Sequence, residues 1–163
     1  MCGICGYISK RKIGDDALEA MNDTMYHRGP NDSGIYQVEV EDKYFGFAQR
    51  RLSIMDLSVL GHQPMFSETN EYVVVFNGEV YNYRDLREEL IEKGHIFKSD
   101  CDTEVILAAY MEWGDAAIEK LDGMFAFAIL NLKTGRTVFA RDRIGTVSYT
   151  HLRAHETLMN IVC

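Results

Sequence analysis

The sequence lacks any long hydrophobic run. None of its apolar stretches approaches the roughly 18 residues that a membrane-spanning helix needs. Residues 1–30 also lack the basic start and the following apolar stretch of a signal peptide. These two absences argue against a membrane protein and a secreted protein, and we expect a cytoplasmic one.

Positive charge is also scarce. The chain has 17 Lys and Arg against 25 Asp and Glu, a formal net charge of −8, and no basic run that could offset phosphate repulsion. We therefore expect a small polar substrate and no nucleic acid or anionic membrane as partner. With 163 residues, 47% hydrophobic and 26% charged, and without repeats, the chain is typical of one globular domain.

Cysteines are few and lack the spacing of a disulfide framework. There are four, Cys2, Cys5, Cys101 and Cys163, which we expect to be thiols. Cys2 and Cys5 form a CxxC pair, but no second pair completes a zinc site. A redox CxxC normally begins a helix, whereas the sequence after Cys5 alternates as a strand does. We interpret Cys5 as an apolar strand residue.

The position of Cys2 favours a different chemistry. Removal of Met1 would give Cys2 a free α-amino group, whose pKa of about 7.7 to 8.0 suits a proton acceptor at neutral pH. One residue would then supply both nucleophile and base, and Gly3 would allow a close approach of substrate. The start of the chain is therefore typical of an N-terminal nucleophile, although Met-Cys-Gly alone is a weak signal.

Hydrophobic periodicity predicts a mixed α+β fold. Asp15 or Asp16 is the expected N-cap of the first helix, Asn82 of the second and Asp102 of the third. We expect Met21 and Met25 in the core. The predicted strands are 6–9, 34–40, 43–49, 71–78 (ending in Asn-Gly), 95–99, 124–132 and 136–143, the helices are 15–29, 82–94 and 102–114, and 51–70 is a long loop.

Several motifs in unbroken order closely resemble the class II glutamine amidotransferase domain of asparagine synthetases. The resemblance runs from residue 2 to residue 145. Its motifs are MCGICGY (1–7), HRGPNDSG (27–34), RRLSIMDLS (50–58), LGHQPM (60–65), FNGEVYNY (76–83), SDCDTEVIL (99–107), GMFAFAIL (123–130) and ARDRIG (140–145).

The resemblance implies an N-terminal nucleophile hydrolase fold, a four-layer αββα sandwich with antiparallel sheets. It implies an incomplete glutaminase domain at 2–145, with the C-terminal part of the fold missing and the synthetase domain absent from this chain. No phosphate-binding loop is recognisable here, so we expect no cofactor in this chain. ATP and magnesium would belong to the synthetase domain, and the resemblance leaves a homodimer open as an assembly.

The resemblance also implies roles for individual residues. Cys2 would attack the side-chain amide of glutamine, and Asn77 and Gly78 would form the oxyanion hole. Arg51 would hold the α-carboxylate of glutamine through a two-pronged hydrogen bond. The remaining substrate-binding residues would be Leu52, Ile54, Glu79 and Asp102, of which Glu79 and Asp102 would hold the α-ammonium.

Each role has a structural alternative. Asp102 could serve only as a helix cap, Asn77-Gly78 could be only a turn, and Arg51 could be a surface charge. His27 is better read as a packed or loop-ordering residue than as a catalytic one. Two other functions stay open, an amidotransferase that feeds ammonia to an acceptor other than aspartate, and a non-catalytic module that only binds glutamine.

Residues 146–163 do not continue the resemblance. Residues 146–157 read as a translated frame of a transposase-type sequencing-library adapter, so we interpret 146–163 as an assembly artefact in which Cys163 has no role. The competing interpretation is a metal site formed by His151, His155 and Glu156, because two histidines four residues apart suit zinc on a helix.

Overall fold

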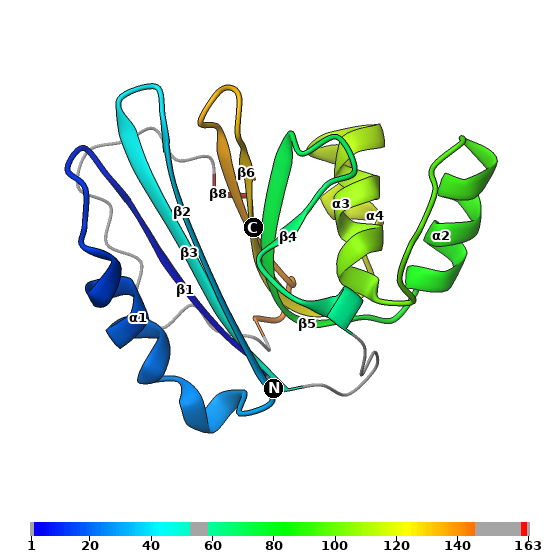
Figure 1. Ribbon diagram of the computed structural model, residues 1–163. Coiled ribbons are helices and arrows are strands. Elements are labelled where there is room, and N and C mark those ends of the chain that lie inside the picture. Colours follow the sequence, from blue (N-terminus) through cyan, green and yellow to red (C-terminus); the bar gives the residue numbers. More distant parts are fainter. Residues whose placement is uncertain (1, 53–58, 146–160, 163) are drawn as a thin grey trace.

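The computed structural model describes residues 2–52, 59–145 and 161–162, which form two β-sheets and four α-helices (Figure 1). Two 3-10 helices, η1 (Tyr26–Arg28) and η2 (Val59–Gly61), accompany them. The strands are β1 (Gly3–Ser9), β2 (Asp32–Val40), β3 (Lys43–Arg51), β4 (Met65–Phe66), β5 (Tyr72–Val80), β6 (Gly123–Asn131), β7 (Thr137–Arg141) and β8 (Ile161–Val162), and the helices are α1 (Asp15–Asp23), α2 (Tyr83–Glu92), α3 (Asp102–Trp113) and α4 (Ala116–Lys120).

The strands divide into a small and a larger sheet. The small sheet has the order β1-β3-β2, and both of its pairs are antiparallel. The larger sheet has the order β4-β5-β6-β7-β8, in which β7 and β8 are parallel and the other pairs are antiparallel. This confirms the predicted α+β class with antiparallel sheets. Within the described ranges, no helix has the length and apolar character needed to cross a membrane.

The two sheets lie face to face, with helices on their outer sides (Figure 1). Helix α1 covers the outer face of the small sheet, where Leu18 packs close to Gly46 of β3. Helices α2, α3 and α4 lie on the outer side of the larger sheet (Figure 1). The layer order is therefore α1, small sheet, larger sheet, α2–α4.

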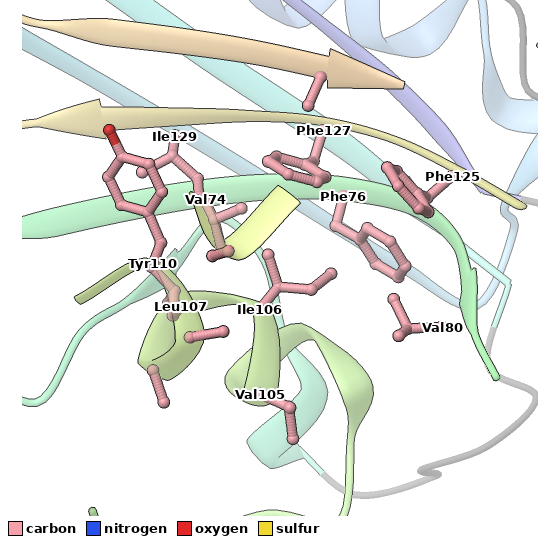
Figure 2. Packing of buried hydrophobic residues seen from close by; sticks show 14 of the residues in the cluster. Val74, Phe76, Val80, Val105, Ile106, Leu107, Tyr110, Phe125, Phe127 and Ile129 are labelled. Carbon is pink, nitrogen blue, oxygen red and sulfur yellow. The ribbon is translucent and has the colours of Figure 1, made fainter. Parts of the chain in front are cut away.

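Strand β5 has apolar side chains on both faces because it lies between two layers. Val73 and Val75 face the small sheet and pack in one cluster with Phe45 and Phe47 of β3. The alternate residues of β5 face α3. They form a second cluster with residues of α3 and β6 (Figure 2), including Val74, Phe76, Ile106, Leu107, Tyr110, Phe125 and Phe127. The strand therefore appears in the sequence as the continuous apolar run 73–76.

The first helix is shorter than predicted. It ends at Asp23, and the N-cap position is Gly14, with Asp15 and Asp16 in the first turn. After Asp23, the Thr24 hydroxyl donates to the carbonyl of Met21 in the preceding turn. The chain then continues as the tighter 3-10 helix η1. Short polar side chains compete with helical hydrogen bonds in this way.

The predicted strand at 95–99 and the core position of Met21 were wrong. Met21 is 39% exposed, since it lies on the solvent side of α1. Ile96 is 70% exposed, and the amides of Lys98 and Ser99 donate to the carboxylate of Glu104 and not to a neighbouring strand. Backbone amides that a side chain binds in this way cannot pair with a neighbouring strand.

Three further differences concern helices and loops. The predicted loop 51–70 contains η2 and the short strand β4, and α4 was not predicted. Helix α2 begins after Asn82 as expected, but the Asn82 side chain does not cap it. Instead, its amide donates to the carbonyl of Lys120 at 2.9 Å and accepts from the N–H of Asp122 at 3.0 Å.

Candidate active site

The layer between the two sheets changes from apolar to polar at one end. On β3, Gln49 and Arg51 follow Phe47 on the inward face, because alternate residues of a strand share a face. On β5, Asn77 and Glu79 continue the inward face in the same way. The strands that form the core thus also present polar side chains toward one another.

These side chains line a cavity of about 110 Å³. Of the eight residues predicted to form the site, the cavity brings together seven, Cys2, Arg51, Leu52, Asn77, Gly78, Glu79 and Asp102. The eighth, Ile54, lies outside the described residues. Segments that are far apart in the sequence therefore meet at one cavity.

Cys2 is held at both its sulfur and its carbonyl group. The backbone N–H of Leu52 donates to its Sγ at 3.3 Å. The guanidinium of Arg28 donates twice to its carbonyl oxygen, from Nε at 3.3 Å and from Nη2 at 3.2 Å. Arg28 was not among the predicted site residues, although it belongs to the HRGP motif. Together these contacts fix the start of β1 at the cavity wall.

Cys5 lies on the opposite face of β1. Cys5 is paired with Ala48 of β3, and its side chain is on the face of the small sheet that α1 covers. Cys2 instead lines the cavity between the sheets. Burial raises the pKa of the Cys5 thiol to about 11, so it is protonated at neutral pH. Two cysteines on opposite faces of a strand cannot bind one metal ion together. This geometry supports the interpretation of Cys5 as a packed strand residue.

Asn77 and Gly78 lie within β5, so the turn alternative was wrong. Asn77 is opposite Ala126 and Gly78 is opposite Phe125 of β6, and the strand continues to Val80. Gly78 has a φ of 151°, and a Cβ atom there would lie 2.1 Å from the carbonyl oxygen of Met124. Only glycine fits this backbone at this distance from β6.

Arg51 is buried at the cavity, so the surface alternative was also wrong. Only 8% of the residue is exposed. Its guanidinium lies against the backbone of Gly61, where a Cβ atom would be 2.1 Å from Nη2. A planar cation is thereby placed in the cavity wall, where a carboxylate of a ligand could form two hydrogen bonds with it.

Asp102 is the first residue of α3 and not its N-cap. Cys101 holds the cap position, and Asp102 Oδ2 accepts a hydrogen bond from the N–H of Val80 at 3.0 Å. Burial, together with a smaller effect of the charge of Glu79, raises the pKa of Asp102 to about 6, although backbone hydrogen bonds from Val80 and Thr103 lower it. Two neighbouring carboxyl groups at one wall of the cavity favour the binding of a cation.

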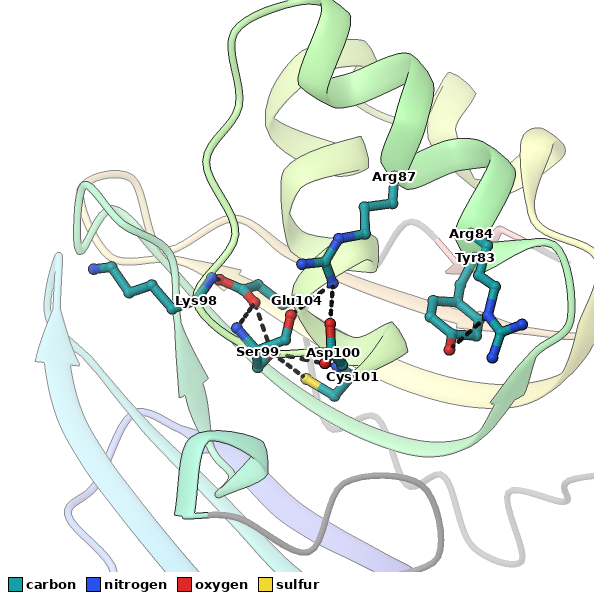
Figure 3. A network of polar contacts seen from close by, with 8 residues as sticks. All are labelled: Tyr83, Arg84, Arg87, Lys98, Ser99, Asp100, Cys101 and Glu104. Atoms are coloured by element: carbon teal, nitrogen blue, oxygen red, sulfur yellow. Dashed lines mark hydrogen bonds and ion pairs between the residues drawn. The ribbon is translucent and has the colours of Figure 1, made fainter.

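A polar network holds the start of α3 in place (Figure 3). The carboxylate of Glu104 accepts from the N–H of Lys98 at 2.9 Å and from the N–H and hydroxyl of Ser99 at 2.8 and 2.6 Å. Arg87 donates to the carbonyl of Ser99 at 2.6 Å and pairs with Asp100 at 3.4 Å. The segment that leads to Asp102 is therefore ordered by side chains.

Gln63 is a site residue that sequence reasoning missed. It is buried at the cavity, and its Oε1 accepts from the N–H of Phe76 at 2.7 Å. Its Nε2 donates to the hydroxyl of Thr103 at 3.2 Å. The side chain thus joins the residue before Asn77 to the residue after Asp102. Its place in the LGHQPM motif was the only available signal, and its partners are distant in sequence.

The other candidates lie elsewhere. His27 is exposed in η1 and does not line the cavity. The residues of the alternative metal site, His151, His155 and Glu156, lie outside the described residues, as does Met1. In the part of the chain that the structure describes, no three His, Cys, Asp or Glu side chains are grouped as metal ligands would be.

Comparison with protein families gives one match that spans nearly the whole chain. The family is described as "Glutamine amidotransferase domain", and its sequence profile matches residues 1–160.

Among individual proteins, the chain is 43% identical over 150 residues to glutamine-hydrolyzing asparagine synthetase 1 of Bacillus subtilis, covering 89% of this chain and 23% of that protein. Glutamine-hydrolyzing asparagine synthetase 1 of Arabidopsis thaliana is 36% identical over 151 residues, with 89% and 25% covered. The chain thus spans about a quarter of the length of the curated relatives that it matches.

Two solved structures have a similar fold at low sequence identity. One is described as the allosteric regulatory enzyme of purine biosynthesis, with a TM-score of 0.68, 19% identity and coverage of 85% of this chain and 37% of that chain. The other is a glutamine phosphoribosylpyrophosphate amidotransferase from B. subtilis, with a TM-score of 0.63, 19% identity and the same coverage. At this identity the likeness concerns the fold.

Proposed function

Because the chain belongs to the class II glutamine amidotransferase family, we propose that it hydrolyses glutamine to glutamate and ammonia with Cys2 as nucleophile. The observation that carries this proposal is the cavity, at which Cys2 meets Arg51, Asn77, Gly78 and Asp102. We also propose that the fold is the four-layer αββα sandwich of N-terminal nucleophile hydrolases. The layer order and the likeness to an amidotransferase structure support this assignment.

In the proposed reaction, the Cys2 sulfur attacks the carboxamide carbon of glutamine. The thiol proton passes to the α-amine of Cys2 and from there to the departing nitrogen, which leaves as ammonia. Water then hydrolyses the resulting thioester to glutamate and regenerates the thiol. This scheme requires that Met1 be removed, because an acylated amine cannot accept the proton.

The oxyanion of each tetrahedral intermediate would be held by the side-chain amide of Asn77 and the N–H of Gly78. The place of both residues in β5, which is paired with β6, supports this role, since donors on a strand that is fixed before the reaction need not reorganise during it. The bare Cα of Gly78 leaves its N–H unshielded by a side chain.

Substrate recognition would involve the charged groups around the cavity. Arg51 would bind the α-carboxylate of glutamine, and Glu79 and Asp102 would bind its α-ammonium. The raised pKa of Asp102 supports this pairing, since burial, and to a lesser extent the charge of Glu79, disfavours its anionic form, and a cationic group of the ligand would offset both effects. Leu52 and Ile54 would be the remaining substrate-binding residues.

The ammonia would serve the ATP-dependent synthesis of asparagine from aspartate. The names of the relatives support this acceptor, and the chain spans only about a quarter of their length. We therefore assign ATP and magnesium to a synthetase domain beyond these residues, and we propose 2–145 as the part that carries the glutaminase fold. For 146–163 the adapter interpretation stays a proposal that resequencing of the source DNA would test.

A glutamine hydrolysis assay tests the function. Protein with Cys2 at its N-terminus is incubated with L-glutamine, and glutamate and ammonia are measured separately. We expect both products in equal amounts, and neither from Cys2→Ala. Binding of glutamine without release of glutamate would instead show a binding module and would contradict the proposal.

A further inference from the structure

Gln49 is a fully buried polar residue that the proposed mechanism does not use. Its exposed fraction is 0%, and it lines the same cavity as Cys2. The register that pairs Gly3 with Arg50 also pairs Ile4 with Gln49. Gln49 therefore points inward from β3 two residues before Arg51. It lies roughly 7 Å further into the layer between the sheets than Cys2 and Arg51 do.

The orientation of the Gln49 amide is set by one hydrogen bond. Its Nε2 donates to the carbonyl oxygen of Phe76 at 3.4 Å. The flipped amide would bring two oxygens together, so the oxygen of Gln49 must point away from Phe76. This oxygen, Oε1, has no hydrogen-bond partner among residues 2–52, 59–145 and 161–162.

A second amide oxygen at the cavity is in the same situation. Asn77 Oδ1 is buried, and the described residues offer it no partner either. A buried acceptor without a donor costs about 1–3 kcal/mol, and folded proteins avoid this in most cases. Two such oxygens at one cavity indicate a ligand that brings N–H groups to this wall.

We propose that Gln49 Oε1 accepts a hydrogen bond from the carboxamide nitrogen of the bound glutamine and thereby distinguishes glutamine from glutamate. This inference rests on the proposed glutaminase function and extends it to a residue outside the predicted site. The other parts of the cavity are lined by the charged groups that we assign to the charged end of glutamine, namely Arg51, Glu79 and Asp102.

The chemistry of the two side chains supports this pairing. A neutral amide oxygen matches the uncharged NH₂ of a carboxamide, which has hydrogens to donate. The γ-carboxylate of glutamate has none, and the oxygen that takes the place of the carboxamide nitrogen would be repelled by Gln49 Oε1. The same contact that favours the substrate would therefore disfavour the product glutamate, and would remain satisfied while the nitrogen leaves as ammonia.

The test compares two substrates that form the same thioester. L-glutamine has the carboxamide N–H groups, and L-glutamate γ-methyl ester lacks them and releases methanol. For Gln49→Met we expect kcat/KM for glutamine to fall roughly tenfold, the effect of losing one hydrogen bond, and kcat/KM for the ester to stay within about twofold. The matched control is Gln37→Met on β2, whose side chain bonds to Tyr7 and Asp15 away from the cavity and which should change neither value.

A second measurement does not depend on turnover. In a Cys2→Ala background, calorimetry compares the dissociation constants of L-glutamine and L-glutamate with and without Gln49→Met. We expect the preference for glutamine to fall by about tenfold. An equal loss for amide and ester, or an unchanged preference in calorimetry, would overturn the role of Gln49. If the unsubstituted protein hydrolyses neither substrate and binds no glutamine, the proposed function itself fails.

Discussion

The carboxylate of Asp102 accepts a hydrogen bond from the backbone N–H of Val80 at 3.0 Å, so the first turn of α3 is tied to the end of β5. This contact places a buried carboxyl group at the cavity. Burial raises its pKa from 3.8 to about 6, so the native state binds its proton more tightly than the unfolded state does. The free energy of unfolding therefore decreases as the pH rises from about 4 to about 6.

We expect Asp102→Asn to stabilise the protein above pH 6, because the neutral amide keeps an acceptor for Val80 and carries no buried charge. The gain at pH 7.5 should reach up to about 3 kcal/mol and vanish near pH 4. Denaturant unfolding at the two pH values measures it. The same variant should bind glutamine poorly. A gain of equal size at both pH values would contradict the assigned pKa.

Substitution of Cys2 by Ala or Ser should abolish glutamine hydrolysis. A version that retains Met1 or carries an N-terminal tag should be equally inactive, because nucleophile and base share one residue. Glutamate release measures both effects. A cleavable tag provides the control, since its removal to expose Cys2 should restore the activity. Full turnover by the tagged protein would rule out the α-amine as base.

Arg51→Lys and Asn77→Ala should affect different kinetic constants. Lysine cannot form the two-pronged contact with a carboxylate, so we expect a higher KM for glutamine and a nearly unchanged kcat. Loss of an oxyanion donor should lower kcat about a hundredfold or more. Steady-state kinetics on both variants checks this division. A pure KM effect in Asn77→Ala would show that the oxyanion role is wrong.

Gly78→Ala should destabilise the protein by about 1–3 kcal/mol. The φ at this position is unfavourable for alanine, and the new Cβ would crowd the carbonyl of Met124. Gly94→Ala is the matched control. Its φ of 97° is also positive, but nothing lies within 4 Å of the added Cβ. Thermal melting of the two variants should show the larger loss for Gly78→Ala. Equal losses would mean that contact with β6 is unimportant.

Gln63→Met should lower kcat more than it raises KM, because Phe76 loses the acceptor that holds the backbone next to Asn77. Gln63→Glu keeps an acceptor for Phe76 and loses only the donation to Thr103, so it should retain more activity. Steady-state kinetics separates the two constants. If both variants lose activity to the same extent, Gln63 does not act through Phe76.

Much of the fold follows from local alternation of residues. The inward row of β3 is visible in the sequence, and the same alternation carries it on to Arg51, whereas β5 appears as a continuous apolar run because both of its faces are buried. The sequence alone favoured a turn at Asn77-Gly78, since Asn and Gly are common in turns and uncommon in strands. The pairing with Ala126 and Phe125 of β6 decides this, and that pairing spans about fifty residues.

Other parts of the site depend on partners that no local pattern reveals. Gln63 forms hydrogen bonds with Phe76 and Thr103, which are 13 and 40 residues away. The segment before α3 resembled a strand, but the carboxylate of Glu104 takes the amides that a neighbouring strand would have bound. Side-chain competition of this kind becomes visible only once the chain is folded.

The position of Asn77 and Gly78 inside a strand ladder also affects whether the site can unfold separately from the rest of the protein. Groups in a turn can detach by local opening while the rest of a protein stays folded. Here the two residues are paired with β6, and β5 is packed on both faces, so they can separate only when the larger sheet itself opens. Heat inactivation of the site should therefore coincide with global unfolding, and any substitution that strengthens the two sheets would raise the temperature at which the site survives.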